Sequence, residues 1–263
     1  MFLKKISILS AIMVIAIMAN VSSAQWLWWT NDAANNQWTD TGNWTAFPTG
    51  GDDVVIGRDT ANGPILNTGE TGYAAWMHLS DTTASGSLLT INGGTLQVGD
   101  HLLVGENWGA GHKGTLLVNS GTVNTTLLMV GGGTSGSIGD GSVIINGGTI
   151  NVSWLLAVAG GYSGTNSGGT GNIQLAGGVI DVTGGGGLVM ADNGSIDITG
   201  GALILNGEIS DITNYGNVTA FGGNGSFVYD IAGGRTTITA MIPEPATLII
   251  IGLGSLLLRR KTR

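Results

Sequence analysis

Residues 89–94 read Leu-Thr-Ile-Asn-Gly-Gly, and close variants of this hexapeptide recur four more times along the chain. Each copy alternates apolar and polar residues before it ends in a small or glycine pair, the pattern of a half-buried strand that runs into a tight turn. The last glycines of successive copies are 27, 27, 30 and 23 residues apart, a period typical of stacked repeats. The five copies occupy residues 89–94, 116–121, 143–148, 173–178 and 196–201.

Two further apolar stretches follow each of the first four turns, and after the fifth turn only the first of the two is recognisable. Three short strands of period two in every repeat predict an all-β fold, a single-stranded parallel β-helix or solenoid. No coil can fold alone, because it has half a core and two unpaired edges, whereas stacking gives each strand neighbours about 4.8 Å away. The inward positions of the second strand are predicted to be Leu96/Val98, Val123/Thr125, Ile150/Val152, Ile180/Val182 and Leu203/Leu205.

The corners of the coils are rich in glycine and asparagine. Of the 263 residues 48 are glycine, more than twice the usual share of roughly 7%. Glycine tolerates positive φ and close backbone approach. Asn92, Asn119 and Asn146 fall at one corner of three successive coils, where we expect left-handed backbone and an internal ladder of amide hydrogen bonds. A row of ligand-binding amides is the alternative.

The repeats are expected to occupy residues 87–212, preceded by a cap and irregular first coils over 25–86 and followed by closing strands over 213–242. Five of the eight tryptophans crowd the cap, where we expect them to plug the first coil. Because aromatic rings also stack on sugars, a glycan-binding surface is the alternative for this cluster. Its members are Trp26, Trp28, Trp29, Trp38 and Trp44.

The two ends of the chain have the patterns of targeting segments. Residues 1–24 comprise a basic start, 14 mostly apolar residues and a small-residue site that predicts cleavage between Ala24 and Gln25. This apolar run is shorter than the roughly 20 residues of a spanning helix, which favours a signal helix that is removed on export. Residues 243–263 comprise Pro-Glu-Pro, thirteen uncharged residues and a basic end, which predict a C-terminal transmembrane helix with its basic end in the cytoplasm.

The order of Pro243-Glu244-Pro245, apolar run and basic end with Arg259 and Arg260 resembles the PEP-CTERM sorting signal of exported proteins of Gram-negative bacteria. The resemblance implies processing by an exosortase, a membrane transpeptidase-like enzyme, and a setting in which exopolysaccharide is produced. The body, which opens with Asn43-Trp44 and residues 51–56, is similar to autotransporter-like repeat proteins that carry this tail. That similarity implies a right-handed β-helix.

Composition excludes several classes of function. The chain has no cysteine, which excludes a disulfide scaffold, a Cys-ligated zinc and a thiol nucleophile. From Gln25 to Pro243 three basic residues stand against 16 acidic ones, a net charge of −13. So acidic a body repels phosphate backbones, and we expect no nucleic-acid partner.

The outward positions of the repeats offer no paired carboxylates. Asp181 and Asp197 fall on different strands, and Arg58 and Arg235 lie outside the repeats. A lyase would lack its base and a hydrolase its partner acid, so we expect no catalytic activity; a lyase or hydrolase site built by loops is the minor alternative. The two columns are Thr90, Leu117, Ile144, Gln174, Asp197 and Gln97, Asn124, Asn151, Asp181, Ile204.

Asp100-His101 and the segment from Glu106 to His112 form the best local candidate for a metal site, although a solvated corner is the simpler interpretation and we expect no metal or cofactor. His78 is the third histidine. The glycine run 184–187 lacks the Lys-Ser/Thr of a phosphate loop and is interpreted as a flexible turn.

Together these observations predict an exported structural β-helix of the cell surface or extracellular matrix. Its expected partners are the exosortase, the inner membrane through the C-terminal helix, and exopolysaccharide. A carbohydrate-binding module is the alternative, with the five tryptophans of the cap as its site.

Overall fold

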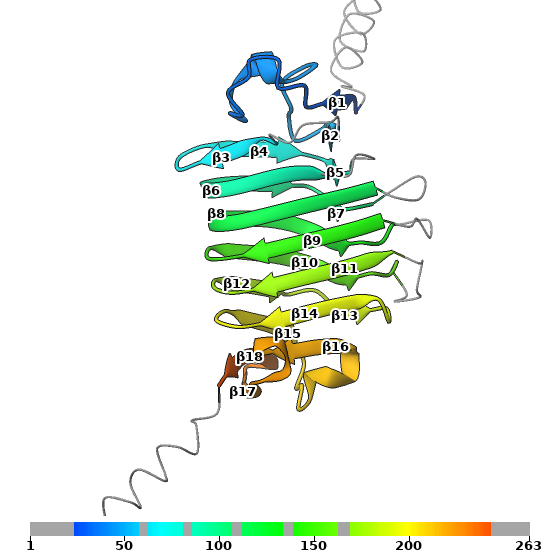
Figure 1. Ribbon diagram of the computed structural model, residues 1–263, viewed down its shortest axis with the longest axis vertical. Coiled ribbons are helices and arrows are strands. Elements are labelled where there is room, and N and C mark those ends of the chain that lie inside the picture. The colour runs from blue at the N-terminus through cyan, green and yellow to red at the C-terminus, as the bar shows by residue number, and fades with distance from the viewer. Residues whose placement is uncertain are drawn as a thin grey trace, which may run out of the picture.

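The chain is all-β and forms a parallel solenoid of about six turns (Figure 1). The structure is a computed structural model that describes residues 24–57, 63–80, 86–106, 112–133, 139–162 and 169–242. The C-terminal segment and all of the signal segment except Ala24 lie outside these residues. Within them, no helix is both long enough and apolar enough to cross a bilayer.

The central coils each contribute three strand segments that meet at two corners. Some segments join into one long strand that continues around a corner, as in the second coil. The central strands are β6 (Ser87–Val98), β7 (His101–Val104), β8 (His112–Val130), β9 (Gly139–Ile145), β10 (Thr149–Val158), β11 (Thr170–Leu175), β12 (Val179–Val182) and β13 (Gly187–Met190).

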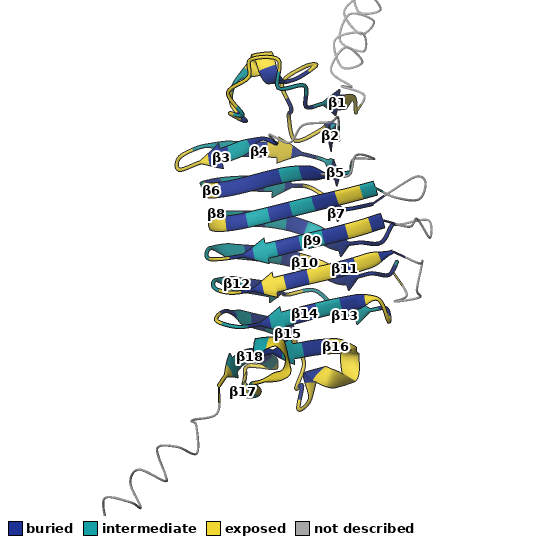
Figure 2. Ribbon diagram, viewed as in Figure 1, coloured by how far each residue is buried: buried dark blue, intermediate teal, exposed yellow. Residues whose placement is uncertain are grey.

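The register confirms the predicted stacking of parallel coils. The first inward position of the second segment aligns from coil to coil, and every side chain in this column is buried, so one apolar lumen runs through the stack (Figure 2). Alternate residues point outward, which produces the alternating burial along β9 and β11. The aligned column is Leu96, Val123, Ile150, Ile180 and Leu203.

The N-terminal end is closed by irregular coils and a tryptophan plug. Trp29, Trp38 and Trp44 are buried, with ring centroids 4.9 Å apart for Trp29–Trp44 and 4.7 Å apart for Trp38–Trp44, both edge to face. The Trp44 Nε1 donates a hydrogen bond of 2.8 Å to the Trp38 carbonyl, which satisfies its polar atom inside the core. The elements here are β1 (Trp26–Trp28), η1 (Thr41–Asn43), β2 (Asp53–Ile56), β3 (Ile65–Asn67), β4 (Thr71–Ala74) and β5 (Trp76–Leu79).

The C-terminal end changes from parallel to antiparallel pairing. One more parallel rung forms where β16 pairs with β14, and then β18 pairs antiparallel with both β15 and β17. The buried Ile238 of β18 covers the lumen. The elements are β14 (Gly194–Ile198), β15 (Ala202–Asn206), η2 (Ile212–Tyr215), β16 (Asn217–Ala220), η3 (Phe221–Gly223), β17 (Ser226–Ala232) and β18 (Arg235–Met241).

The asparagine ladder exists, but its predicted setting was wrong. The amide of Asn119 donates to Asn92 and that of Asn146 donates to Asn119, each over 2.8 Å. All three side chains are exposed, so the ladder lies on the outer wall. The left-handed backbone belongs instead to a glycine of the same turn, such as Gly121 with φ 95°. Glycine is also needed there for space, because a Cβ would lie 2.3 Å from the carbonyl of the coil before.

Candidate functional site

The five tryptophans predicted as cap or glycan site divide into two groups. Trp29, Trp38 and Trp44 form the plug, so their ring faces are closed to a sugar. Trp28 is half-buried, and Trp26 is 45% exposed. The glycan hypothesis for this cluster therefore narrows to the two residues of β1.

The predicted processing residues lie at or beyond the edges of the described chain. Ala24 and Gln25 are both exposed and directly precede β1, where the Gln25 carbonyl accepts a hydrogen bond of 2.9 Å from the Asp53 amide. The sorting-signal residues Pro243, Glu244, Pro245, Arg259 and Arg260 lie outside the described residues, as does Arg58.

Both predicted outward columns align in the structure, and their carboxylates hold the C-terminal cap. Asp181 forms an ion pair with Arg235 of β18. Asp197 accepts hydrogen bonds from the Thr219 hydroxyl over 2.7 Å and the Gly222 amide over 2.8 Å. These contacts fasten the last strands to the stack. The pairings that align the columns join β6 to β8, β8 to β9 and β10, β9 to β11, β11 to β14, β10 to β12, and β12 to β15.

The third outer face, formed by β5, β7, the end of β8, the end of β10 and β13, is apolar where the other two are mixed. Its outward side chains form a second buried cluster, separate from the lumen. Trp76 and Val189 are partly buried and pack against this cluster. Apolar residues on both sides of a strand are typical of one that is covered on both faces. The members are Leu103, Leu127, Met129, Leu155 and Ala157.

An aromatic chain runs along this third face. Trp76 and His101 occupy adjacent rungs of β5 and β7 and stack with ring centroids 3.8 Å apart and planes inclined by 14°. His78, two residues after Trp76 on β5, has its ring centroid 6.3 Å from that of Trp76, and the Trp26 ring lies 5.2 Å from His78. The chain therefore extends from β1 to β7 across neighbouring coils.

Tyr162 and Trp154 extend the chain toward the later coils. The Tyr162 hydroxyl lies 2.6 Å from the Nε2 of His101, and the rings of Trp154 and Tyr162 are 5.7 Å apart. Trp154 lies where the register of β10 shifts between Val152 and Leu155. Such an irregularity redirects side chains, and here the indole points outward and is 42% exposed.

The electrostatics of His101 fix the hydrogen bond to Tyr162. Burial lowers the pKa of His101, opposed by Asp100, whose Oδ1 lies 2.9 Å from the imidazole Nδ1. Burial also raises the pKa of Tyr162, reinforced by the charges of Asp100 and Glu106. The lowered pKa favours neutral His101 at neutral pH; with its proton on Nδ1 beside the carboxylate, Nε2 accepts a hydrogen bond from the Tyr162 hydroxyl.

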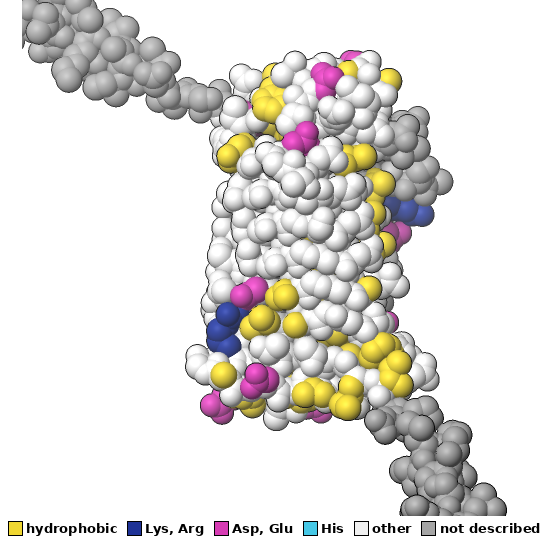
Figure 3. All heavy atoms as spheres, turned by 90° about the vertical axis from the view of Figure 1, so that its left-hand side faces the viewer, with side chains coloured by type: hydrophobic (Ala, Val, Ile, Leu, Met, Phe, Trp, Pro, Cys, Tyr) yellow, Lys and Arg dark blue, Asp and Glu magenta, His cyan; other side chains and the backbone are white. Residues whose placement is uncertain are grey.

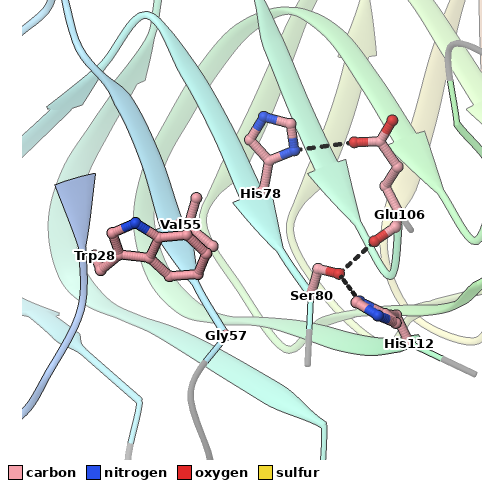
Figure 4. A pocket seen from close by; sticks show the side chains of 7 residues that line it. All are labelled: Trp28, Val55, Gly57, His78, Ser80, Glu106 and His112. Carbon is pink, nitrogen blue, oxygen red and sulfur yellow. Dashed lines mark hydrogen bonds and ion pairs between the residues drawn. The ribbon is translucent and has the colours of Figure 1, made fainter. Parts of the chain in front are cut away.

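A pocket of about 150 Å³ adjoins the N-terminal end of this face (Figure 4). Its polar wall contains three contacts between neighbouring coils. The Nδ1 of His78 lies 2.9 Å from Glu106 Oε2, and the Ser80 hydroxyl donates to the Glu106 carbonyl and lies 2.6 Å from His112 Nδ1. The pocket is lined by Trp28, Val55, Gly57, His78, Ser80, Glu106 and His112.

Ser80 and His112 lie within hydrogen-bond distance, but the contacts around them differ from those of a serine–histidine–carboxylate triad. A serine nucleophile gives its proton to a histidine that a carboxylate orients. Here the Ser80 proton points to a main-chain carbonyl, and the Glu106 carboxylate orients His78 instead of His112. Among the described residues, no group of three or more His, Asp or Glu side chains is placed to hold a metal ion.

Sequence proximity predicted only part of this group. Asp100 lies beside His101, and Glu106 and His112 meet at Ser80, but the direct partners of Glu106 and His101 are His78, 28 residues earlier, and Tyr162, 61 residues later. The sequence patterns did not indicate Ser80, Trp76, Trp154 or Tyr162 as site residues. Extending the third-segment alignment upstream would have placed Trp76 beside His101, because β5 and β7 are in register.

Comparisons with protein-family models, with curated proteins and with solved structures find no match.

Proposed function

We propose that this chain is an exported, non-catalytic β-helix that serves as a structural rod at the cell surface or in the extracellular matrix. A C-terminal PEP-CTERM signal, cut by an exosortase-type enzyme, sorts it there from the inner membrane. The observation that supports this role best is the single apolar lumen, which is continuous from the tryptophan plug to Ile238. The right-handed winding implied by the resemblance belongs to the same proposal.

The closed lumen supports a mechanical role because it gives a rod that is complete in itself. The tryptophan plug covers one end of the stack, and strand β18, paired antiparallel with β15, covers the other. Neither end therefore offers an open lumen to a second copy of this chain. The described chain begins at the β1 end and leaves from the β18 end (Figure 1). A tail that is held at a membrane would therefore let the rod project away from it.

The outer wall supports a role in a crowded polymer environment. On the face seen in Figure 3, the middle coils present mainly uncharged polar side chains and backbone. The described carboxylates Asp181 and Asp197 are engaged in holding the cap, and Glu106 is paired with His78. These contacts give these three carboxylates a structural role, which favours a protein without catalytic activity.

Export and processing can be tested by the intact mass of the product recovered outside the producing cells. We expect a mass that lacks the signal segment and the residues beyond the Pro-Glu-Pro motif. Replacing Pro243, Glu244 and Pro245 by alanine should leave the tail attached and retain the chain in the membrane fraction. Alanine at Thr262, in the same tail, is the matched control and should be processed normally. An unprocessed chain found in the cytoplasm would contradict the proposal.

A further inference from the structure

Trp154 and Tyr162 form a rigid aromatic surface on the third outer face. Their side chains are 42% and 41% exposed, whereas the neighbouring outward leucines are buried. The hydrogen bond from the Tyr162 hydroxyl to His101 fixes the first ring, and the contact with Tyr162 fixes the second. His101 is itself held by stacking on Trp76. Two large rings are therefore ordered and partly open to solvent before any ligand arrives.

The glycine run 184–187 passes against Trp154. A Cβ on Gly184 would lie 2.2 Å from the Trp154 Cα, and one on Gly186 would lie 3.0 Å from the indole Nε1. No heavy atom lies within 4 Å of a Cβ built on Gly185 or Gly187. Glycine here lets the next coil approach Trp154 without covering its ring with a side chain. The run interpreted from the sequence as a flexible turn thus also leaves the Trp154 ring uncovered.

We propose that Trp154 and Tyr162 bind a sugar ring of a neutral, hydroxyl-rich polysaccharide. The apolar C–H face of a pyranose packs on an aromatic ring, and its hydroxyl groups need hydrogen-bond partners at the edge. Because both rings are fixed beforehand, binding costs little side-chain entropy. This site goes beyond the structural role, and it uses none of the five tryptophans of the cap.

Charge selects a neutral polymer over an anionic one. The body carries a net charge of −13, which repels uronate, sulfate and phosphate groups. The Asp100 carboxylate lies beside His101 and raises the pKa of Tyr162, so its negative charge acts at the aromatic pair. It is 48% exposed, which leaves it able to accept a hydrogen bond from a sugar hydroxyl.

The test is retention of the exported protein in gels that contain one polysaccharide each. The probes are a neutral β-glucan, a neutral α-glucan and a neutral galactomannan, with alginate as the anionic comparison. We expect at least one neutral polymer to retard the protein and alginate not to. Trp154→Ala should weaken that binding by about tenfold or more, since stacking on one aromatic ring contributes on the order of 1–3 kcal/mol. Trp154→Phe should keep most of it.

Tyr73→Ala is the matched control, because Tyr73 is 46% exposed but lies on β4, on a different face. It should bind as the parent does. Tyr162→Phe keeps the ring but loses the hydrogen bond to the buried His101, and should weaken binding by about two- to fivefold while lowering the thermal midpoint by only a few degrees. Equal binding by parent and Trp154→Ala, retardation by alginate alone, or no retardation by any neutral polymer would each overturn the proposal. None of these outcomes bears on export or tail processing, so the proposed function is tested separately, by the intact mass of the product.

Discussion

The lumen and the third outer face are both apolar, but they are built differently. In the lumen each coil repeats the same kind of residue, as in the column of Leu102, Leu128, Leu156 and Leu188. The outward column beside it changes from rung to rung, through Trp76, His101, Leu127, Leu155 and Gly187. Repetition suits a core in which every coil must fit the next. The varied face carries the aromatic and imidazole groups, because an outward position, unlike a position in the lumen, does not have to repeat the residue of the coil before it.

The comparison also separates two uses of glycine. At the corners, such as Gly131, the next coil leaves no space for a Cβ. Around Trp154, at Gly185 and Gly187, space is open and the missing side chain keeps the aromatic surface accessible. The following variants test these differences.

The largest expected effect is that of Gly131→Ala. Gly131 has φ 73°, and its Cβ would lie 1.7 Å from the Thr170 carbonyl, so two coils would have to separate. We expect a loss of more than about 3 kcal/mol in the free energy of unfolding, measured by urea denaturation. Gly187→Ala, at φ 64° with open space, should cost only about 1 kcal/mol. Equal losses would show that backbone strain and not stacking limits the corners.

A second test compares leucines of the two apolar clusters. Leu156 lies in the lumen and Leu103 in the outer cluster, and both are fully buried. Leu156→Ala should lower the free energy of unfolding by about 4 kcal/mol and Leu103→Ala by about 2 kcal/mol, because the smaller outer cluster can collapse around a cavity. If Leu103→Ala cost as much, the outer cluster would rank as a second core.

The third test uses pH. The pKa of His101 is lowered below 6.5 in the folded protein, so the unfolded chain takes up a proton first as the pH falls. Stability should therefore be fully present above about pH 6.5 and decline as the solution is acidified toward pH 5. Thermal midpoints of the parent and of His101→Phe, which keeps a ring on Trp76, should diverge over this window, with a flatter profile for the variant. Parallel pH profiles of the two proteins would contradict the lowered pKa of His101 in the folded state.

The smallest expected effect is on the outer asparagine ladder. Asn119→Ala removes two amide hydrogen bonds of 2.8 Å, but the site is exposed and water replaces them. We expect a loss of about 0.5–1 kcal/mol by urea denaturation. Asn119→Asp keeps the acceptor for Asn146 and should fall between the parent and alanine. A loss above 2 kcal/mol would show that the ladder sets the coil register.

Sequence patterns predicted the periodic parts well and the site poorly. Leu96 and Val123 could be aligned because the same local pattern recurs in each repeat: the residue two positions after the last glycine of the turn points inward. The plug was anticipated from the crowding of tryptophans, but not which three enter the core. His78 and Glu106 belong to coils of different length, so no fixed spacing relates them.

By itself the sequence determined the parallel stack, its corners and the inward columns, because these depend on local turns and period-two burial that recur in every coil. Only the tertiary structure decided the outer surface: that the asparagines face solvent, that Arg235 reaches Asp181, and that Tyr162 meets His101. The physical reason is that coil lengths and a local register shift at Trp154 set which outward side chains become neighbours, and neither quantity is repeated along the chain.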